Sequence, residues 1–230
     1  MSKSLSVAML GASGAVGSEV VNTLLSMPEL KQLTLLGRRE IMLPTSAKSK
    51  SVSQHLIDID ASATWAPLVA GHESAVCTFG VGEASKVSKA ELAHIDKDVV
   101  IAFATICKQA GVKHFELLNS VGADARSRSF YLRTKGELCD ALIALNFERL
   151  SLFQPSMILT PTNRYGVSQA LTLAVWPTLS HLMLGPMQKF RGVRVETLGA
   201  AIAKNLATTG RGVESLQWDR FDALASSDDT

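Results

Sequence analysis

Tyr131 and Lys135 are four residues apart, a spacing that could support acid–base chemistry. On a helix, residues at this spacing lie on one face, so the phenol and the ammonium group would be neighbours. A free phenol has a pKa of about 10, which is too high for efficient proton transfer at neutral pH. A nearby ammonium group favours the phenolate and lowers this pKa, so Tyr131 could exchange a proton with a substrate. Ser120, on the preceding segment, could hydrogen-bond a carbonyl oxygen of a substrate. The alternative is an incidental pair on an exposed helix.

A second candidate site lies at the N-terminus, where the stretch 4–17 joins a short apolar segment to three glycines. Gly11 allows a tight turn, Gly14 lets the backbone approach a pyrophosphate, and Gly17 allows the following helix to pack closely. The free N–H groups at the start of that helix favour phosphate. A glycine turn used only for packing is the alternative. We expect a dinucleotide site formed here by Gly11, Ser13, Gly14, Ala15 and Val16.

Arg38 and Arg39 follow the second predicted strand. A site for NAD usually has an acidic residue here, which holds the ribose 2′-hydroxyl. An arginine instead offers a planar set of donors for a 2′-phosphate. The absence of an acidic residue at 37–39 favours NADP(H) as the cofactor, although Glu40 lies just beyond, and Lys135 is a further candidate ribose contact. Two solvated arginines in a loop are the alternative.

Asp58 follows the third predicted strand, at a position that commonly meets the adenine edge in dinucleotide-binding folds. A carboxylate there can accept a hydrogen bond from the exocyclic amine. Asp60 is a less favoured substitute, and capping of a turn is an equal alternative for either residue. Gly80 ends another predicted strand and is assigned to the same cofactor site.

Strands and helices alternate through residue 153, which predicts a Rossmann-type, doubly wound parallel sheet of the α/β class. Ligands bind such sheets outside the carboxyl ends of the strands, where the candidate residues above fall. The expected strands are 5–10, 33–36, 55–59, 74–79, 112–119 and 150–153. The expected helices are 15–26, 98–110 and 131–145, a connecting helix ends at 67–71, 84–93 is a polar loop or short helix, and 41–53 is irregular.

The pattern loosens after Ser156, with an apolar stretch at 171–187 and a further helix at 195–206. We expect one NAD(P)-binding Rossmann domain over 1–230, in which 156–220 contributes a small C-terminal lobe on the substrate side. The residue types in this lobe do not indicate which substrate the protein binds.

Composition excludes several classes of function. The chain has 230 residues and a formal net charge of +2, so nothing favours nucleic acid as a partner. No apolar run reaches the roughly 18 residues of a membrane span, the N-terminus does not resemble a signal peptide, and no Cys/His spacing suits a metal. A small-molecule substrate is the expected partner, and monomer and homodimer stay open. The cysteines, Cys77, Cys107 and Cys139, are expected to be buried thiols in a reducing, cytoplasmic compartment.

Together the glycine turn, Arg38, Ser120, Tyr131 and Lys135 resemble a short-chain dehydrogenase/reductase of the atypical kind. The segments KHFELLNSVGAD, FYLRTKGELCDAL and FERLSLFQPSMIL are similar to the Tat-interacting-protein oxidoreductase family and its bacterial NAD(P)-binding relatives. The resemblance implies NADPH in an extended groove, catalysis by the serine, the tyrosine and the lysine, and Pro155 beside the nicotinamide.

Two positions depart from the pattern of that family. Many members place an Asn on the helix before the serine strand, and 98–110 contains none. Ser156 stands where the family has a glycine after the proline. The sequence therefore supports two hypotheses. The first is an NADPH-dependent reductase of a carbonyl compound with Tyr131 as general acid, and the second is an NADP(H)-binding regulatory protein that acts as a sensor without turnover.

Overall fold

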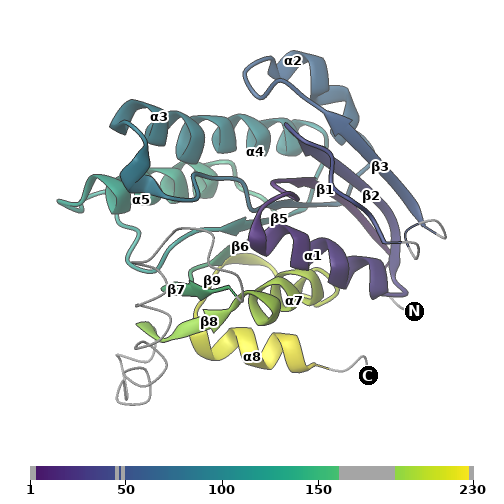
Figure 1. Ribbon diagram of the computed structural model, residues 1–230. Helices are drawn as coiled ribbons and strands as arrows, with labels where there is room; N and C mark the ends of the chain where they lie inside the picture. Colours follow the sequence, from purple (N-terminus) through teal and green to yellow (C-terminus); the bar gives the residue numbers. More distant parts are fainter. Residues whose placement is uncertain (1–3, 45–46, 48–49, 161–189, 228–230) are drawn as a thin grey trace.

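A seven-stranded parallel sheet lies between two layers of helices in the computed structural model, which describes residues 4–44, 47, 50–160 and 190–227 (Figure 1). The predicted Rossmann-type fold is confirmed. The chain runs outward in both directions from β1 and β4, so the carboxyl ends of these two strands form the topological switch point where such sheets bind ligands. In sheet order the strands are β3 (Ser51–Leu56), β2 (Leu30–Gly37), β1 (Leu5–Leu10), β4 (Ser74–Cys77), β5 (His114–Leu118), β6 (Arg149–Phe153) and β9 (Gly212–Leu216).

Helices cover both faces of the sheet (Figure 1). One face carries α1 (Ala15–Ser26), α7 (Val195–Asn205) and α8 (Trp218–Ser226). The other face carries α2 (Ser62–Trp65), α4 (Val99–Gln109) and α5 (Phe130–Ala144). Shorter elements join them: η2 (Ala66–Val69), η3 (Ala84–Lys86), α3 (Lys89–Ala93) and the π-helical turn η4 (His94–Asp98). A second, two-stranded parallel sheet is formed by β7 (Met157–Leu159) and β8 (Gly192–Arg194).

The central strand β1 explains why two hydrophobic cores form. Val7 and Met9 pack in the core beneath α1 and α7, whereas Ala8 and Leu10 pack in the core beneath α4. Side chains alternate between the faces of a strand, and a strand covered on both faces is apolar throughout. Full burial of one large apolar side chain contributes about 1.5–3 kcal/mol. The glycine turn that follows β1 is therefore attached to a central strand that is covered on both faces.

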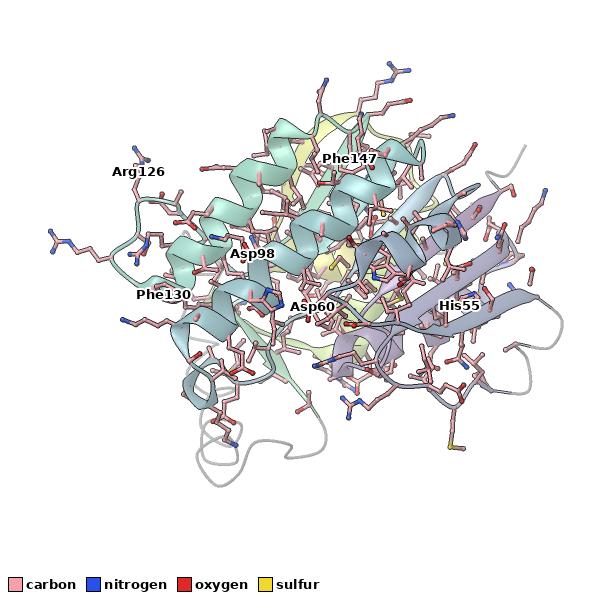
Figure 2. All side chains as sticks on the ribbon, turned by 90° about the horizontal axis from the view of Figure 1, so that it is seen from above. His55, Asp60, Asp98, Arg126, Phe130 and Phe147 are labelled. Atoms are coloured by element: carbon pink, nitrogen blue, oxygen red, sulfur yellow. The ribbon has the colours of Figure 1, made fainter. Side chains whose placement is uncertain are left out.

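The expected third strand is misplaced, and several later elements have no expected counterpart. The third strand is β3, which begins four residues before the expected 55–59 and lies partly inside the stretch expected to be irregular. No strand or helix is expected from the sequence at the positions of β7, β8, β9 and α8. Strands β3 and β9 lie at the edges of the main sheet, where exposed polar side chains replace the apolar alternation that marks an inner strand. Figure 2 shows His55 on the outer edge strand.

The C-terminal third completes the main domain. Helix α7 packs on α1 so closely that a Cβ at Gly199 would lie 2.3 Å from the Cβ of Glu19, and β9 pairs with β6. The expected helix at 195–206 is confirmed as α7. The apolar stretch at 171–187 lies outside the described residues. A substrate-side lobe over 156–220 stays a prediction, and its described part includes strand and helix of the Rossmann layers.

Candidate functional site

The turn between β1 and α1 is built around glycine. Gly11 has a φ of +102°, and a Cβ there would lie 2.5 Å from the backbone nitrogen of Phe79. At Gly17 a Cβ would lie 2.1 Å from the carbonyl oxygen of Gly11, which accepts a hydrogen bond from the Thr78 hydroxyl at 3.0 Å. These two glycines permit the close contact of the turn with β4. At Gly14 a Cβ would meet only that same carbonyl oxygen, at 3.4 Å, so its outer side is open.

Two adjoining cavities lie at the switch point. We call the cavity beside α5, about 420 Å³ in volume, the inner cavity, and the one beside the end of β2, about 360 Å³, the outer cavity. They share the start of α1 and the segment after β4. The shared lining is Gly14, Ala15, Thr78, Phe79, Gly80, Val81 and Gly82. The two cavities therefore form one groove along the carboxyl ends of the strands, as the fold requires of a dinucleotide site.

Tyr131 and Lys135 of α5 line the inner cavity, and so does Val16 of α1. The Lys135 ammonium lies 5.9 Å from the centre of the Tyr131 ring. Helix α5 is held in place at Gly136, where a Cβ would lie 2.1 Å from the backbone nitrogen of Ala125. The helix and the loop before it thus fix the phenol and the ammonium on one wall of the groove.

Asp96 is a site residue that the sequence reasoning missed. Its carboxylate is buried in η4, lies 3.0 Å from the Lys135 ammonium, and lines the inner cavity. The helix expected at 98–110 begins two residues after Asp96, so Asp96 fell outside the predicted element. A signal existed, because Asp96 falls on the apolar stripe of this helical segment between Leu92 and Val100, where a charged residue needs a partner.

Ser120 does not line either cavity. Its hydroxyl donates to the carbonyl oxygen of the next residue, Val121, at 3.3 Å, while the preceding residue, Asn119, lines the inner cavity. The hydroxyl-bearing residues that line the inner cavity are Thr78, Tyr131, Ser156 and Thr160. Of the expected catalytic set, Tyr131 and Lys135 therefore line the same cavity, whereas the Ser120 hydroxyl is directed at the Val121 carbonyl oxygen.

Arg38 and Arg39 are exposed and line the outer cavity, together with Gly11 and Ser13. The Arg38 guanidinium lies over the Phe79 ring, 5.5 Å from its centre. This contact brings the end of β2 against the segment after β4. A cation at this end of the groove can attract a phosphate group.

Asp58 and Pro155 lie outside the lining of both cavities. Asp58 caps a turn, since its carboxylate accepts a hydrogen bond from the backbone N–H of Asp60 at 3.0 Å. Asp60 instead pairs with His94 of η4 at 2.8 Å, and Figure 2 shows it beside that turn. The carbonyl oxygen of Pro155 accepts a hydrogen bond from Val121 at 3.0 Å, which places the next residue, Ser156, in the wall of the inner cavity.

Within the described residues, no cluster of three or more His, Cys, Asp or Glu side chains could hold a metal ion. The helices of this part of the chain are all too short or too polar to cross a membrane.

Comparisons with known proteins agree with this geometry. A family model described as NAD(P)H-binding matches residues 11–145. Protein HTATIP2 from Rattus norvegicus is 31% identical over 207 residues, which is 90% of this chain and 83% of the relative. The Candida albicans protein named "Protein FMP52, mitochondrial" is 32% identical over 179 residues, covering 75% of this chain and 76% of that protein.

Solved structures match the fold at low identity. MoeE5 in complex with UDP-glucuronic acid and NAD superposes with a TM-score of 0.71 at 16% identity, covering 92% of this chain and 75% of that one. The Bordetella bronchiseptica enzyme WbmH in complex with NAD⁺ gives a TM-score of 0.66 at 15% identity, with 94% and 75% covered. Fold, groove and sequence agree: the chain belongs to the NAD(P)H-binding, atypical short-chain dehydrogenases/reductases, in the group that contains HTATIP2 and FMP52.

Proposed function

We propose that this protein is an oxidoreductase that uses NADPH to reduce a carbonyl compound, with Tyr131 as the general acid. The observation that supports the proposal most directly is that residues of α5 and of the start of α1 line the same inner cavity. Tyr131 and Lys135 line it together with residues at the start of α1. Acid–base groups thus face the part of the groove that a dinucleotide enters.

The residues present fit such a cofactor. The open side of Gly14 leaves room for a pyrophosphate at the start of α1. The exposed arginines after β2 offer donors for a 2′-phosphate, so NADPH is the form proposed. Lys135, at the other end of the groove, would hold the ribose next to the nicotinamide.

Apart from the hydride, each proposed step uses a group of this chain. When bound, the reduced nicotinamide supplies the hydride that a carbonyl carbon accepts. Tyr131 donates its proton to the carbonyl oxygen, so the carbonyl becomes an alcohol and a phenolate remains. The Lys135 ammonium, 5.9 Å from the ring centre, stabilises that phenolate. Ser120 would have to turn its hydroxyl from Val121 toward the cavity in order to hold the carbonyl oxygen.

The orientation of Ser120 favours the second candidate, an NADP(H)-binding regulatory protein. A site that binds the cofactor and lacks a directed serine can sense the cofactor without turning over a substrate. A small-molecule substrate and a cytoplasmic location belong to the first proposal. The location stays a prediction because fungal relatives are named mitochondrial proteins.

Tyr131→Phe separates the two candidates. We would screen NADPH oxidation against aldehydes, ketones and quinones, and then measure the variant with every compound that reacts. The loss of a general acid typically costs about 10²–10⁴-fold in rate, and NADPH affinity should hardly change. Turnover that survives in Tyr131→Phe would refute the assignment of the general acid. NADPH binding that changes the affinity for a protein partner, without any turnover, would favour the sensor.

A further inference from the structure

Asp96 joins three separate segments at the inner cavity. One carboxylate oxygen lies 3.0 Å from the Lys135 ammonium on α5, and the other accepts a hydrogen bond from the Val81 N–H at 2.6 Å, after β4. Asp96 itself lies on η4, a π-helical turn, and such turns occur frequently at functional sites. A Cβ at Gly80 would lie 3.1 Å from the same carboxylate, so the glycine leaves room for this arrangement.

Burial makes this pair different from the other ion pairs nearby. The side chains of Lys135 and Asp96 are 7% and 2% exposed, whereas those of Lys97 and Glu137 are 25% and 42% exposed. Removing one partner of a buried ion pair is strongly destabilising because the other charge is left without compensation, so the positions of Lys135 and Asp96 depend on each other. The carboxylate also fixes where the ammonium sits, because Gly136 holds the helix and Asp96 holds the tip of the side chain.

An ammonium group has three N–H donors. The ion pair occupies the side of Lys135 that faces η4, and the residue still lines the cavity that it shares with Tyr131. The remaining donors are therefore available to a molecule in the groove.

We propose that Asp96 is a positioning residue, which acts through Lys135 to aim these donors at the ribose next to the nicotinamide. The inference rests on the cofactor part of the proposed function. It predicts an effect at one end of the groove only, because the arginines that would hold the 2′-phosphate lie in the outer cavity.

The test compares two ligands by calorimetry: NADPH, and adenosine 2′,5′-bisphosphate, which has no nicotinamide ribose. Asp96→Asn keeps an oxygen for the Val81 N–H and removes the charge that holds Lys135. We expect NADPH affinity to fall by about tenfold or more and bisphosphate affinity to stay within about twofold. Asp98→Asn is the matched control, since this neighbouring carboxylate is 57% exposed and lies 3.9 Å from Lys97. Its affinities should equal those of the wild type.

A second comparison tests the route through Lys135 and is independent of whether Asp96→Asn folds. The comparison is between Lys135→Met, which leaves the Asp96 carboxylate without its partner, and Asp96→Asn/Lys135→Met, which removes both charges of the ion pair. The double variant should bind NADPH no more weakly than Lys135→Met, because Asp96 has nothing left to position. A further loss in the double variant, or an equal loss of both ligands in Asp96→Asn, would show a structural role and overturn the proposal. Both comparisons measure binding and not turnover. A failure to find any carbonyl compound that reacts would therefore contradict only the proposed reaction. A wild-type protein that does not bind NADPH overturns both.

Discussion

The proposed preference for NADPH can be tested at single residues. Arg38 and Arg39 are exposed at the outer cavity, and Arg38→Asp replaces the charge proposed to bind the 2′-phosphate with one that would repel it. We expect NADPH affinity to fall by about tenfold or more while NADH affinity is retained, because a charge-assisted hydrogen bond is lost only with the phosphorylated form. Calorimetry with both dinucleotides measures this. Arg126→Asp, on the loop before α5 and 93% exposed, is the control (Figure 2). Equal affinities in the unaltered protein would contradict the 2′-phosphate site.

The cysteines make a second prediction for single residues. Burial raises the pKa of Cys77 to about 12 and that of Cys139 to about 11, and it raises the pKa of Cys107 well above its usual range. All three are free thiols, as expected from the sequence. Since the thiolate is the reactive form, an aromatic disulfide reagent at pH 7 should label the native protein very slowly. After denaturation without reductant it should count three thiols; a count of one would indicate a disulfide.

At the scale of elements, the contact of α1 with the end of β4 can be tested with two glycines. Gly17→Ala would place a Cβ 2.1 Å from the Gly11 carbonyl oxygen and should destabilise the protein by about 1–3 kcal/mol, because the helix must move. Gly14→Val has room in the protein but fills the space expected for a pyrophosphate. It should fold with nearly unchanged stability and lose most NADPH binding. Denaturant unfolding and calorimetry measure both, and retained binding in folded Gly14→Val would place the phosphates elsewhere.

How far the sequence could predict these elements depends on where each one lies. The strand at 5–10 and the helix at 15–26 have the expected bounds, because a covered central strand and an amphipathic helix impose clear apolar patterns. Edge strands such as β3 do not impose a clear apolar pattern. Among the site residues, the glycine turn, Tyr131 and Lys135 could be found from spacing. Asp96 was missed because its role needs a contact between η4 and α5, and the direction of the Ser120 hydroxyl depends on loop geometry that spacing does not encode.

At the scale of the whole molecule, a buried polar network attaches the C-terminal third to the sheet. Arg149 of β6 donates to Glu214 of β9 at 2.7 Å and to Asn205 of α7 at 2.9 Å. Ser151 donates to the same Glu214 oxygen at 2.6 Å. Burial alone would raise the pKa of Glu214, but these hydrogen bonds and the Arg149 charge hold it below the usual 4.5.

This lowered pKa predicts how stability depends on pH. The folded protein binds the Glu214 proton less readily than the unfolded chain, so the stabilisation is complete above about pH 4.5 and is lost as the pH falls through the folded pKa. Glu214→Gln should lower the melting temperature by about 2–4 °C at pH 7, and the difference should shrink in acid. Glu196→Gln, which changes a surface pair with Arg194, should shift the melting temperature less. A pH-independent difference would rule out the charge as its cause.

The packing of α7 against α1 also determines when the protein can finish folding during its synthesis. Helix α1 is translated well before α7, and its apolar face is buried against α7, with Glu19 touching the position of Gly199. Such a contact joins segments that are far apart in the sequence, and contacts between distant segments slow folding. Until α7 and β9 have been translated, the nascent chain keeps one side of α1 uncovered and the edge of β6 unpaired. A chaperone that recognises exposed apolar helices and open strand edges would therefore find its binding sites in this protein until α7 and β9 have been translated.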